Sequence, residues 1–203
     1  MSAFLGPIHT WLFNKIKIQN ELTDHLLDYA VQNYKNSELG KLTDKRYGKL
    51  EVGELQDIVD ESNIHGWLQE RVSLVENRLA YVVTELVNNY EGSMSAIRAI
   101  AEKTGEQHRV LAAESAKEAW KKVEDTVLDG MPCDMVNKIT EQSDTEVRYE
   151  VVNPIHEKYW TMIGADVESF YEIKTSLIQG MLKETGYQYE SCSETSWRIY
   201  GED

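Results

Sequence analysis

Three of the five histidines, His9, His65 and His156, have related surroundings in the sequence. The first two stand in the segments Ile-His-Thr-Trp-Leu (8–12) and Ile-His-Gly-Trp-Leu (64–68), at a shift of 56 residues. The third follows Pro-Ile, and its tryptophan comes four residues later instead of two. An imidazole titrates near neutral pH and can take a proton, coordinate a metal ion or hydrogen-bond a ligand. These histidines are therefore the candidate site residues.

The similarity extends well beyond the histidines. Residues 8–34 and 64–90 align at the same shift, with several identical or conservatively replaced pairs. These pairs are Val31/Val87, Asn33/Asn89, Tyr34/Tyr90, Lys15/Arg71, Ile16/Val72, Ile18/Leu74 and Leu26/Val82. Self-similarity at a fixed shift predicts an internal repeat.

The repeat gives each histidine the same expected position in a helix. Gly6, Ser62 and Asn153 are the expected N-caps, which puts each histidine at the third helical position. The positive end of the helix dipole disfavours the imidazolium form there, so we expect neutral rings. If segments 1–61 and 62–130 are two helical hairpins packed side by side, the first two histidines begin at the same end and can approach each other. The third would be brought over them from the C-terminal region.

Two ligands suit such a site about equally well. Helix N-termini favour a small anionic molecule. A metal ion held by His9, His65 and His156 is chemically allowed, although three helix dipoles would oppose a cation. The sequence lacks the Glu-x-x-His pairs of di-iron bundles and any His-Glu-x-x-His segment. It names no cofactor.

Three tryptophans accompany the histidines: Trp11, Trp67 and Trp160. They are candidate ligand-binding residues, because aromatic rings beside neutral histidines can line a pocket for a flat ligand. The alternative is that they anchor the ends of a helical core. The histidines have a structural alternative too, since a side chain at the third helical position can reach back to the capping amide.

Catalysis is left undecided by the sequence. A neutral histidine with Glu157 beside it is compatible with general-base chemistry. No Gly-x-Ser-x-Gly segment and no glycine-rich phosphate loop occurs.

Composition limits the partners. With 35 acidic and 21 basic residues the net charge is −14, which disfavours nucleic acid and anionic membrane surfaces. No window approaches the roughly 18 apolar residues of a membrane span, and the N-terminus does not resemble a signal peptide. We therefore expect a soluble, cytoplasmic protein. Cys133 and Cys192 belong to no paired motif and are expected to be free thiols.

Apolar spacing predicts long helices over residues 7–34, 64–90 and 94–128. Between the first two, residues 40–53 show no period and are expected to form a loop, followed by a short helix over 54–60.

The pattern changes in the last third of the chain. Alternation over residues 145–151 predicts a strand, a helix is expected over 166–183, and residues 187–200 should form a hairpin. The predicted fold is therefore mainly α: an antiparallel helical bundle made from two repeated helical hairpins, with a small C-terminal α/β region ending in a β-hairpin. Its parts would be residues 1–135 and 136–203, or one single domain.

Two functions of different classes follow. The first is a cytoplasmic helical protein that binds a small anionic ligand or a metal ion through the histidines. The second is a non-enzymatic interaction or homodimerisation protein, in which the histidines only cap helices. An exposed strand edge in the terminal hairpin would favour the second. The apolar and aromatic residues of that hairpin are Tyr187, Tyr189, Trp197, Ile199 and Tyr200.

Overall fold

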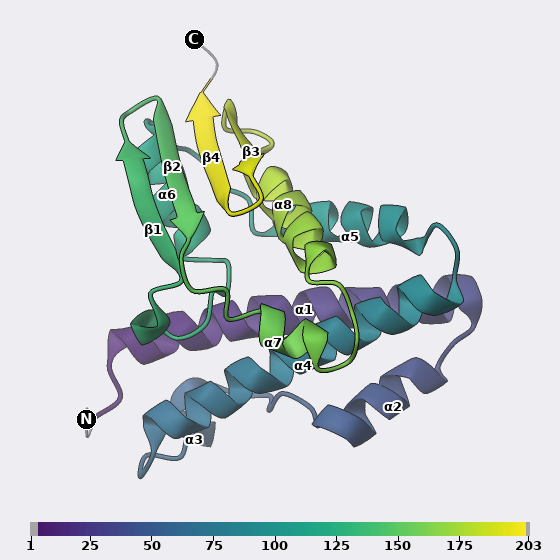
Figure 1. Cartoon of the computed structure of the whole chain (residues 1–203). Helices are drawn as coiled ribbons and strands as arrows, with labels where there is room; N and C mark the ends of the chain where they lie inside the picture. Colours follow the sequence, from purple (N-terminus) through teal and green to yellow (C-terminus); the bar gives the residue numbers. More distant parts are fainter. Residues whose placement is uncertain (1–3, 202–203) are drawn as a thin grey trace.

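The computed structural model describes residues 4–201 and is mainly helical, with a small antiparallel four-stranded sheet in the C-terminal part (Figure 1). The helices are α1 (Pro7–Tyr34), α2 (Glu38–Tyr47), α3 (Leu55–Ile58), α4 (Ile64–Asn89), α5 (Ser93–Gln107), α6 (Ala116–Glu124), α7 (Glu157–Thr161) and α8 (Glu168–Leu182), with a 3-10 turn at Pro132–Asp134. The strands are β1 (Asn137–Gln142), β2 (Glu146–Val151), β3 (Tyr187–Ser193) and β4 (Ser196–Gly201).

The two long helices α1 and α4 lie side by side and run parallel (Figure 1). At their N-terminal ends His9 contacts His65, and at their C-terminal ends the rings of Tyr34 and Tyr90 stack with centroids 3.6 Å apart. Both pairs join residues separated by 56, so the helices pack without a stagger. The long helices predicted at 7–34 and 64–90 are confirmed. The finer arrangement into two repeated hairpins stays a prediction.

Two helical predictions need correction. Helix α2 occupies much of the stretch predicted as a loop, because Leu39 and Thr43 are buried one turn apart. Two buried positions are too few to show a period in the sequence. The predicted helix over 94–128 is two helices, and the chain leaves helical geometry after Gln107. Ser115 caps the second helix by accepting a hydrogen bond from the amide of Glu118.

The sheet has the strand order β1-β2-β4-β3, with every neighbour antiparallel. The terminal hairpin and the strand at 145–151 are confirmed, whereas β1 was not predicted because its side chains are mostly exposed and polar. In the hairpin, Tyr189, Trp197 and Ile199 are buried in the protein's own core. These side chains therefore pack within the chain itself. Strands β1 and β3 form the edges of the sheet.

One buried cluster contains residues from helices α1, α4, α5, α6 and α8 and from the sheet. It includes side chains from both sides of the boundary expected at 135/136, and the division into two parts stays a prediction. A second cluster lies between the N-terminal halves of α1 and α4. Of the helices in the described part of the chain, none is both long and apolar enough to cross a membrane.

Helices α5 and α8 cross in backbone contact at two glycines. A Cβ atom added at Gly105 would overlap the carbonyl oxygen of Leu177, and one added at Gly180 would overlap that of Glu102. The sequence suggests a bend at Gly105, but the helix continues through it. The glycine is required by the neighbouring helix.

We expect Gly105→Ala to destabilise the protein by about 1–3 kcal/mol, because overpacking between the two helices outweighs the helix propensity of alanine. Urea unfolding measures the change. Gly40→Ala is the matched control, since Gly40 is also helical but has ordinary space for a Cβ. That variant should be neutral or more stable by up to about 1 kcal/mol. Equal effects of the two variants would contradict a close crossing.

Candidate functional site

The structure brings two of the predicted site residues together. The Nε2 atoms of His9 and His65 lie 3.5 Å apart, with the ring planes nearly perpendicular. His9 is only 4% exposed, whereas His65 is exposed. The expectation that the two rings meet at one end of the helix pair agrees with this geometry.

The hydrogen bonds around His9 define its protonation. The backbone N–H of Gly6 donates to His9 Nδ1 at 2.9 Å, so the proton of the neutral ring is on Nε2 and points to His65. Burial, followed by the neighbouring imidazole of His65, lowers the pKa of His9. A metal ion at Nε2 would require the proton to move to Nδ1, where it would face the N–H of Gly6. The geometry thus matches the capping interpretation and disfavours metal binding at His9.

The expectation of a common helical position for the three histidines is wrong. Asn63, not Ser62, caps α4 by accepting a hydrogen bond from the amide of Gly66, which puts His65 at the second position. His156 is itself the N-cap residue of the short helix α7. Asparagine caps helices as well as serine does, so residue preference alone does not decide between adjacent candidates.

His156 belongs to a different, buried group of polar side chains. It is 1% exposed, and its ring stacks on Phe170 with centroids 3.9 Å apart. Its Nδ1 lies 3.2 Å from Glu76 Oε2, and its Nε2 lies 3.2 Å from Asp129 Oδ1. Both ring nitrogens therefore face carboxylates, and His156 does not join the other two histidines.

We call Gln19, Glu76, His156, Asp129 and Lys174 the buried charge network. Gln19 donates to Glu76 at 2.9 Å, and Lys174 Nζ donates to Asp129 Oδ1 at 2.6 Å. Two carboxylates thus alternate with two cations, and every charge has an opposite neighbour. This is the condition under which charges can be buried without a large net cost.

The pKa values in this network follow from burial and from the paired charges. Burial lowers the pKa of His156, but Glu76 and Asp129 outweigh this effect and raise it to about 9. Burial raises the pKa of Asp129, yet Lys174 and His156 hold it well below its usual range. At neutral pH the histidine is therefore an imidazolium and the aspartate a carboxylate.

The three tryptophans occupy different environments. Trp11 is half-buried and donates from Nε1 to Asp125 at 2.9 Å. Trp67 is buried against Phe13. Trp160 is buried in the main core, and its Nε1 has no hydrogen-bond partner within residues 4–201. Of the three, Trp11 lines a pocket.

That pocket has a volume of about 510 Å³ and lies between the N-terminal half of α1 and the chain around β1. Lys15 is its most unusual residue. The side chain is 4% exposed, and its Nζ lies 4.0 Å from the centre of the Trp11 ring. In the described part of the chain it makes no hydrogen bond and no ion pair, and its ammonium lies over the Trp11 ring. Burial lowers its pKa to about 8, although Asp129 and Glu124 act in the opposite direction.

Asn137 contributes a second unpaired polar atom to the pocket wall. Its amide nitrogen donates to Asp129 Oδ2 at 2.7 Å, which fixes the orientation of the amide. Its Oδ1 is buried without a partner among the described residues. The pocket thus contains a buried lysine side chain without a hydrogen bond or ion pair and a buried acceptor without a partner. Such groups are uncommon in a folded protein and typical of a binding site.

Sequence reasoning missed Lys15, Glu76, Asp129 and Lys174. The sequence does contain an indication of Lys15, Gln19 and Glu76, because each is a polar side chain at an apolar position of a helix. Positions 12, 15, 19, 22 and 26 are the buried stripe of α1, and two of them carry Lys15 and Gln19. A charged or amide side chain at a core position is a recognisable exception to the apolar pattern. Asp129 follows a helix end and gave no such signal.

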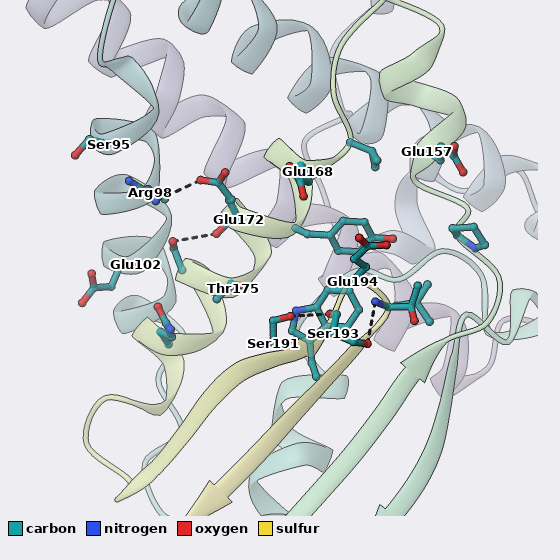
Figure 2. Close-up of a pocket in the computed structure, with 18 of the residues that line it drawn as sticks. Ser95, Arg98, Glu102, Glu157, Glu168, Glu172, Thr175, Ser191, Ser193 and Glu194 are labelled. Carbon is teal, nitrogen blue, oxygen red and sulfur yellow. Dashed lines mark hydrogen bonds and ion pairs between the residues drawn. The ribbon is translucent and has the colours of Figure 1, made fainter.

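A larger pocket of about 1050 Å³ lies between α5, α8 and the hairpin of β3 and β4 (Figure 2). Figure 2 shows glutamates around it, among them Glu102, Glu168 and Glu194, and an ion pair between Arg98 and Glu172. Of the histidines and tryptophans in the predicted site, none lines it. Its polar groups are largely on open surface, and it lacks the buried, unsatisfied groups of the Lys15 pocket.

Across residues 4–201, no group of three or more histidine, cysteine, aspartate or glutamate side chains is arranged to hold a metal ion. Comparison of the chain with protein-family models, with curated proteins and with solved structures gave no match. Function is therefore inferred from the geometry of the site.

The buried charge network predicts a defined pH dependence of stability. The pKa of His156 is about 9 in the folded state and 6.5 when unperturbed, so its contribution is complete below pH 6.5 and is lost as the pH rises through 9. We expect His156→Gln to lower the free energy of unfolding by about 3–5 kcal/mol at pH 6. The difference from the wild type should shrink towards pH 9. Urea unfolding across this range measures both effects.

His108→Gln is the control for that experiment. His108 pairs with Glu21 at 2.7 Å, but its side chain is partly exposed, and exposed pairs contribute only about 0–1 kcal/mol. A pH-independent effect of His156→Gln would show that His156 is neutral in the folded protein.

Lys15 should reduce stability. Its pKa falls from 10.5 to about 8 on folding, so the cost of burying the ammonium is complete below pH 8 and disappears as the pH rises through 10.5. We expect Lys15→Met to raise the free energy of unfolding at pH 7 by about 1–3 kcal/mol. The gain should vanish near pH 10.5, as thermal or urea unfolding can show. A loss of stability in Lys15→Met would mean that the ammonium is satisfied in the fold.

Proposed function

We propose that this protein binds a small anionic molecule, a carboxylate, in the Lys15 pocket. The observation that carries the proposal is a buried lysine side chain whose Nζ makes no hydrogen bond or ion pair, at the wall of a pocket of about 510 Å³. A buried charge without a partner costs free energy, and a ligand of opposite charge removes that cost. The proposal keeps the anionic ligand expected from the sequence and moves the binding group from the histidines to Lys15.

The remaining residues of the pocket support a small organic anion. Lys138 adds a second cation at the pocket, and Trp11 and Met131 supply apolar surface. Two carboxylates also line the pocket: Asp129 is already paired with Lys174 and His156, and Glu124 is exposed to solvent. The unpaired Oδ1 of Asn137 can accept a hydrogen bond from a hydroxyl or amino group on the ligand. A carboxylate with a neighbouring donor group therefore fits better than a simple inorganic anion.

Metal binding and homodimerisation, the other functions expected from the sequence, remain proposals. The proposed binding needs neither a metal ion nor a homodimer. The capping of α1 by His9 supports a structural role for that residue. The net charge of −14 gives a surface field that repels extended polyanions. In a cytoplasmic protein this field would favour small anions that can enter a pocket over such polyanions.

Isothermal titration calorimetry with lactate, succinate and inorganic phosphate at pH 7 tests the proposal. We expect a carboxylate to bind and Lys15→Met to weaken it by roughly 10–100-fold, the value of a charge-assisted hydrogen bond. Affinity should fall as the pH rises above 8, because the ammonium loses its proton. Absence of carboxylate binding to the wild type would refute the proposal.

Arg71→Met is the matched control. Arg71 stands at the position of Lys15 in the second copy of the repeated sequence, and its guanidinium lies 4.0 Å from the centre of the Trp67 ring. It differs in being paired with Glu51 and Glu70 away from the pocket. Equal losses of affinity in the two variants would point to a general charge effect and not to a site at Lys15.

A further inference from the structure

The Lys15 side chain differs from the other buried lysine in one decisive respect. Lys174 is 6% exposed and gives its Nζ to Asp129 at 2.6 Å, within the buried charge network. Asp129 also faces His156 and Asn137, so its oxygens are already engaged by three side chains. Lys15 is buried nearby without such a partner. The fold thus holds one lysine as a fixed cation and leaves the other nitrogen free.

A lysine nitrogen reacts with electrophiles only as the neutral amine. Burial, which the Asp129 and Glu124 charges only partly offset, lowers the pKa of Lys15 to about 8. At pH 7 roughly a tenth of its side chains are then neutral, about 300 times the fraction of a lysine with a pKa of 10.5. Lys174 shows the opposite behaviour, because Asp129 outweighs burial and raises its pKa. Of the two buried lysines, Lys15 is the nucleophile.

The pocket also places groups for a substrate that carries a carboxylate. Lys138 is exposed at the same pocket, at the start of β1, and can pair with a carboxylate while Lys15 meets a second group. The face of the Trp11 ring lies against Lys15, where it can contact a flat, conjugated group. In such a complex Lys138 would contact the carboxylate at one end of a small molecule, and Lys15 would contact the group at its other end.

We propose that Lys15 forms a Schiff base with a small 2-oxo acid or aldehyde acid, whose carbonyl carbon meets the free Nζ and whose carboxylate pairs with Lys138. This inference rests on the proposed function and names its substrate class. An acid without a carbonyl group, such as lactate, pairs with the ammonium form of Lys15, whereas the carbonyl acid reacts with the neutral form. The geometry behind it is the unpaired nitrogen at the wall of a pocket that a second lysine shares.

The step balances without any further reactant. The ammonium releases one proton to solvent, and the nitrogen lone pair attacks the carbonyl carbon. The carbonyl electron pair moves to oxygen, which takes up one of the two protons of the attacking nitrogen to give a carbinolamine. The hydroxyl group then leaves with the other nitrogen proton as water, and the nitrogen electron pair forms the carbon–nitrogen double bond. The net change is one amine and one carbonyl compound converted to one imine and one water, with the imine protonated according to pH.

Reductive trapping tests the inference. The full-length protein is incubated with pyruvate or glyoxylate and sodium cyanoborohydride, and the modified lysine is located by peptide mass spectrometry. We expect one reduced adduct per chain, on Lys15, with the labelling rate rising to a plateau above pH 8. Lys15→Arg should lose the adduct. Lys174 is the internal control, since it is buried but ion-paired and should stay unmodified.

Lys138→Met separates positioning from reactivity. We expect it to slow trapping by pyruvate by roughly tenfold or more, the value of one charge-assisted contact. Trapping by acetaldehyde, which has no carboxylate, should be unchanged. Adducts spread over exposed lysines, or no preference for Lys15, would overturn the inference.

The two proposals fail in distinguishable ways. If lactate or succinate binds in calorimetry and Lys15 is not trapped, the pocket is an anion site and the Schiff base is refuted. If Lys15 is trapped by acetaldehyde and no carboxylate binds, the nucleophile is real and the anionic ligand is refuted. If neither occurs, both proposals are wrong.

Discussion

The structure depends most on the carboxylate of Asp129. It lies in the segment after α6, yet it contacts His156 at the start of α7, Lys174 on α8 and Asn137 on β1. Through His156 and Glu76 the connection continues to α4, and Gln19 extends it to α1. A single, partly buried acid thus ties together parts of the chain that are far apart in sequence. Removing one member leaves its partners charged, unpaired and shielded from water, which costs more free energy than the loss of an exposed ion pair.

The same carboxylate explains why Lys15 is unusual. Asp129 has two oxygens, and the three side chains that hold it leave Lys15 near a negative charge without a direct bond to it. The charge of Asp129 favours the protonated form of Lys15, while burial favours the neutral form and has the larger effect on its pKa. The same contacts of Asp129 therefore pair the charges of the network and leave the Lys15 nitrogen without a partner at the pocket.

The sequence predicts the long elements well because their patterns are long. Twenty-eight residues of α1 provide many turns of apolar spacing. His9 and His65, which hold corresponding positions in two similar segments, lie in contact in the structure. Helix α2 buries only Leu39 and Thr43 among its residues, so no pattern accumulates. The break after Gln107 is set by tertiary contacts, since the amide of Val110 pairs with the carbonyl of Met181.

The site was harder to predict than the fold, because its members come from separate elements. His156 was identified by its sequence surroundings, but its partners Glu76 and Asp129 are 80 and 27 residues away. Residue type favoured the histidines as site residues, whereas the side chain without a hydrogen bond or ion pair at the pocket is a lysine. The better indicator was position: a charged side chain in the buried stripe of a helix needs an explanation, and Lys15 has none in the fold itself.

The crossing of α5 and α8 would limit how this region rearranges around the ligand that we propose. Gly105 and Gly180 bring the two backbones into direct contact, with no side chain between them that can change rotamer. Lys174 lies on the same helix, less than two turns before Gly180, and its position is fixed by that crossing. The network behind the pocket is therefore preorganised, and binding of the proposed ligand would cost little free energy of rearrangement there. Adaptation to that ligand would fall to the side chains at the pocket mouth and to the segment between α6 and β1.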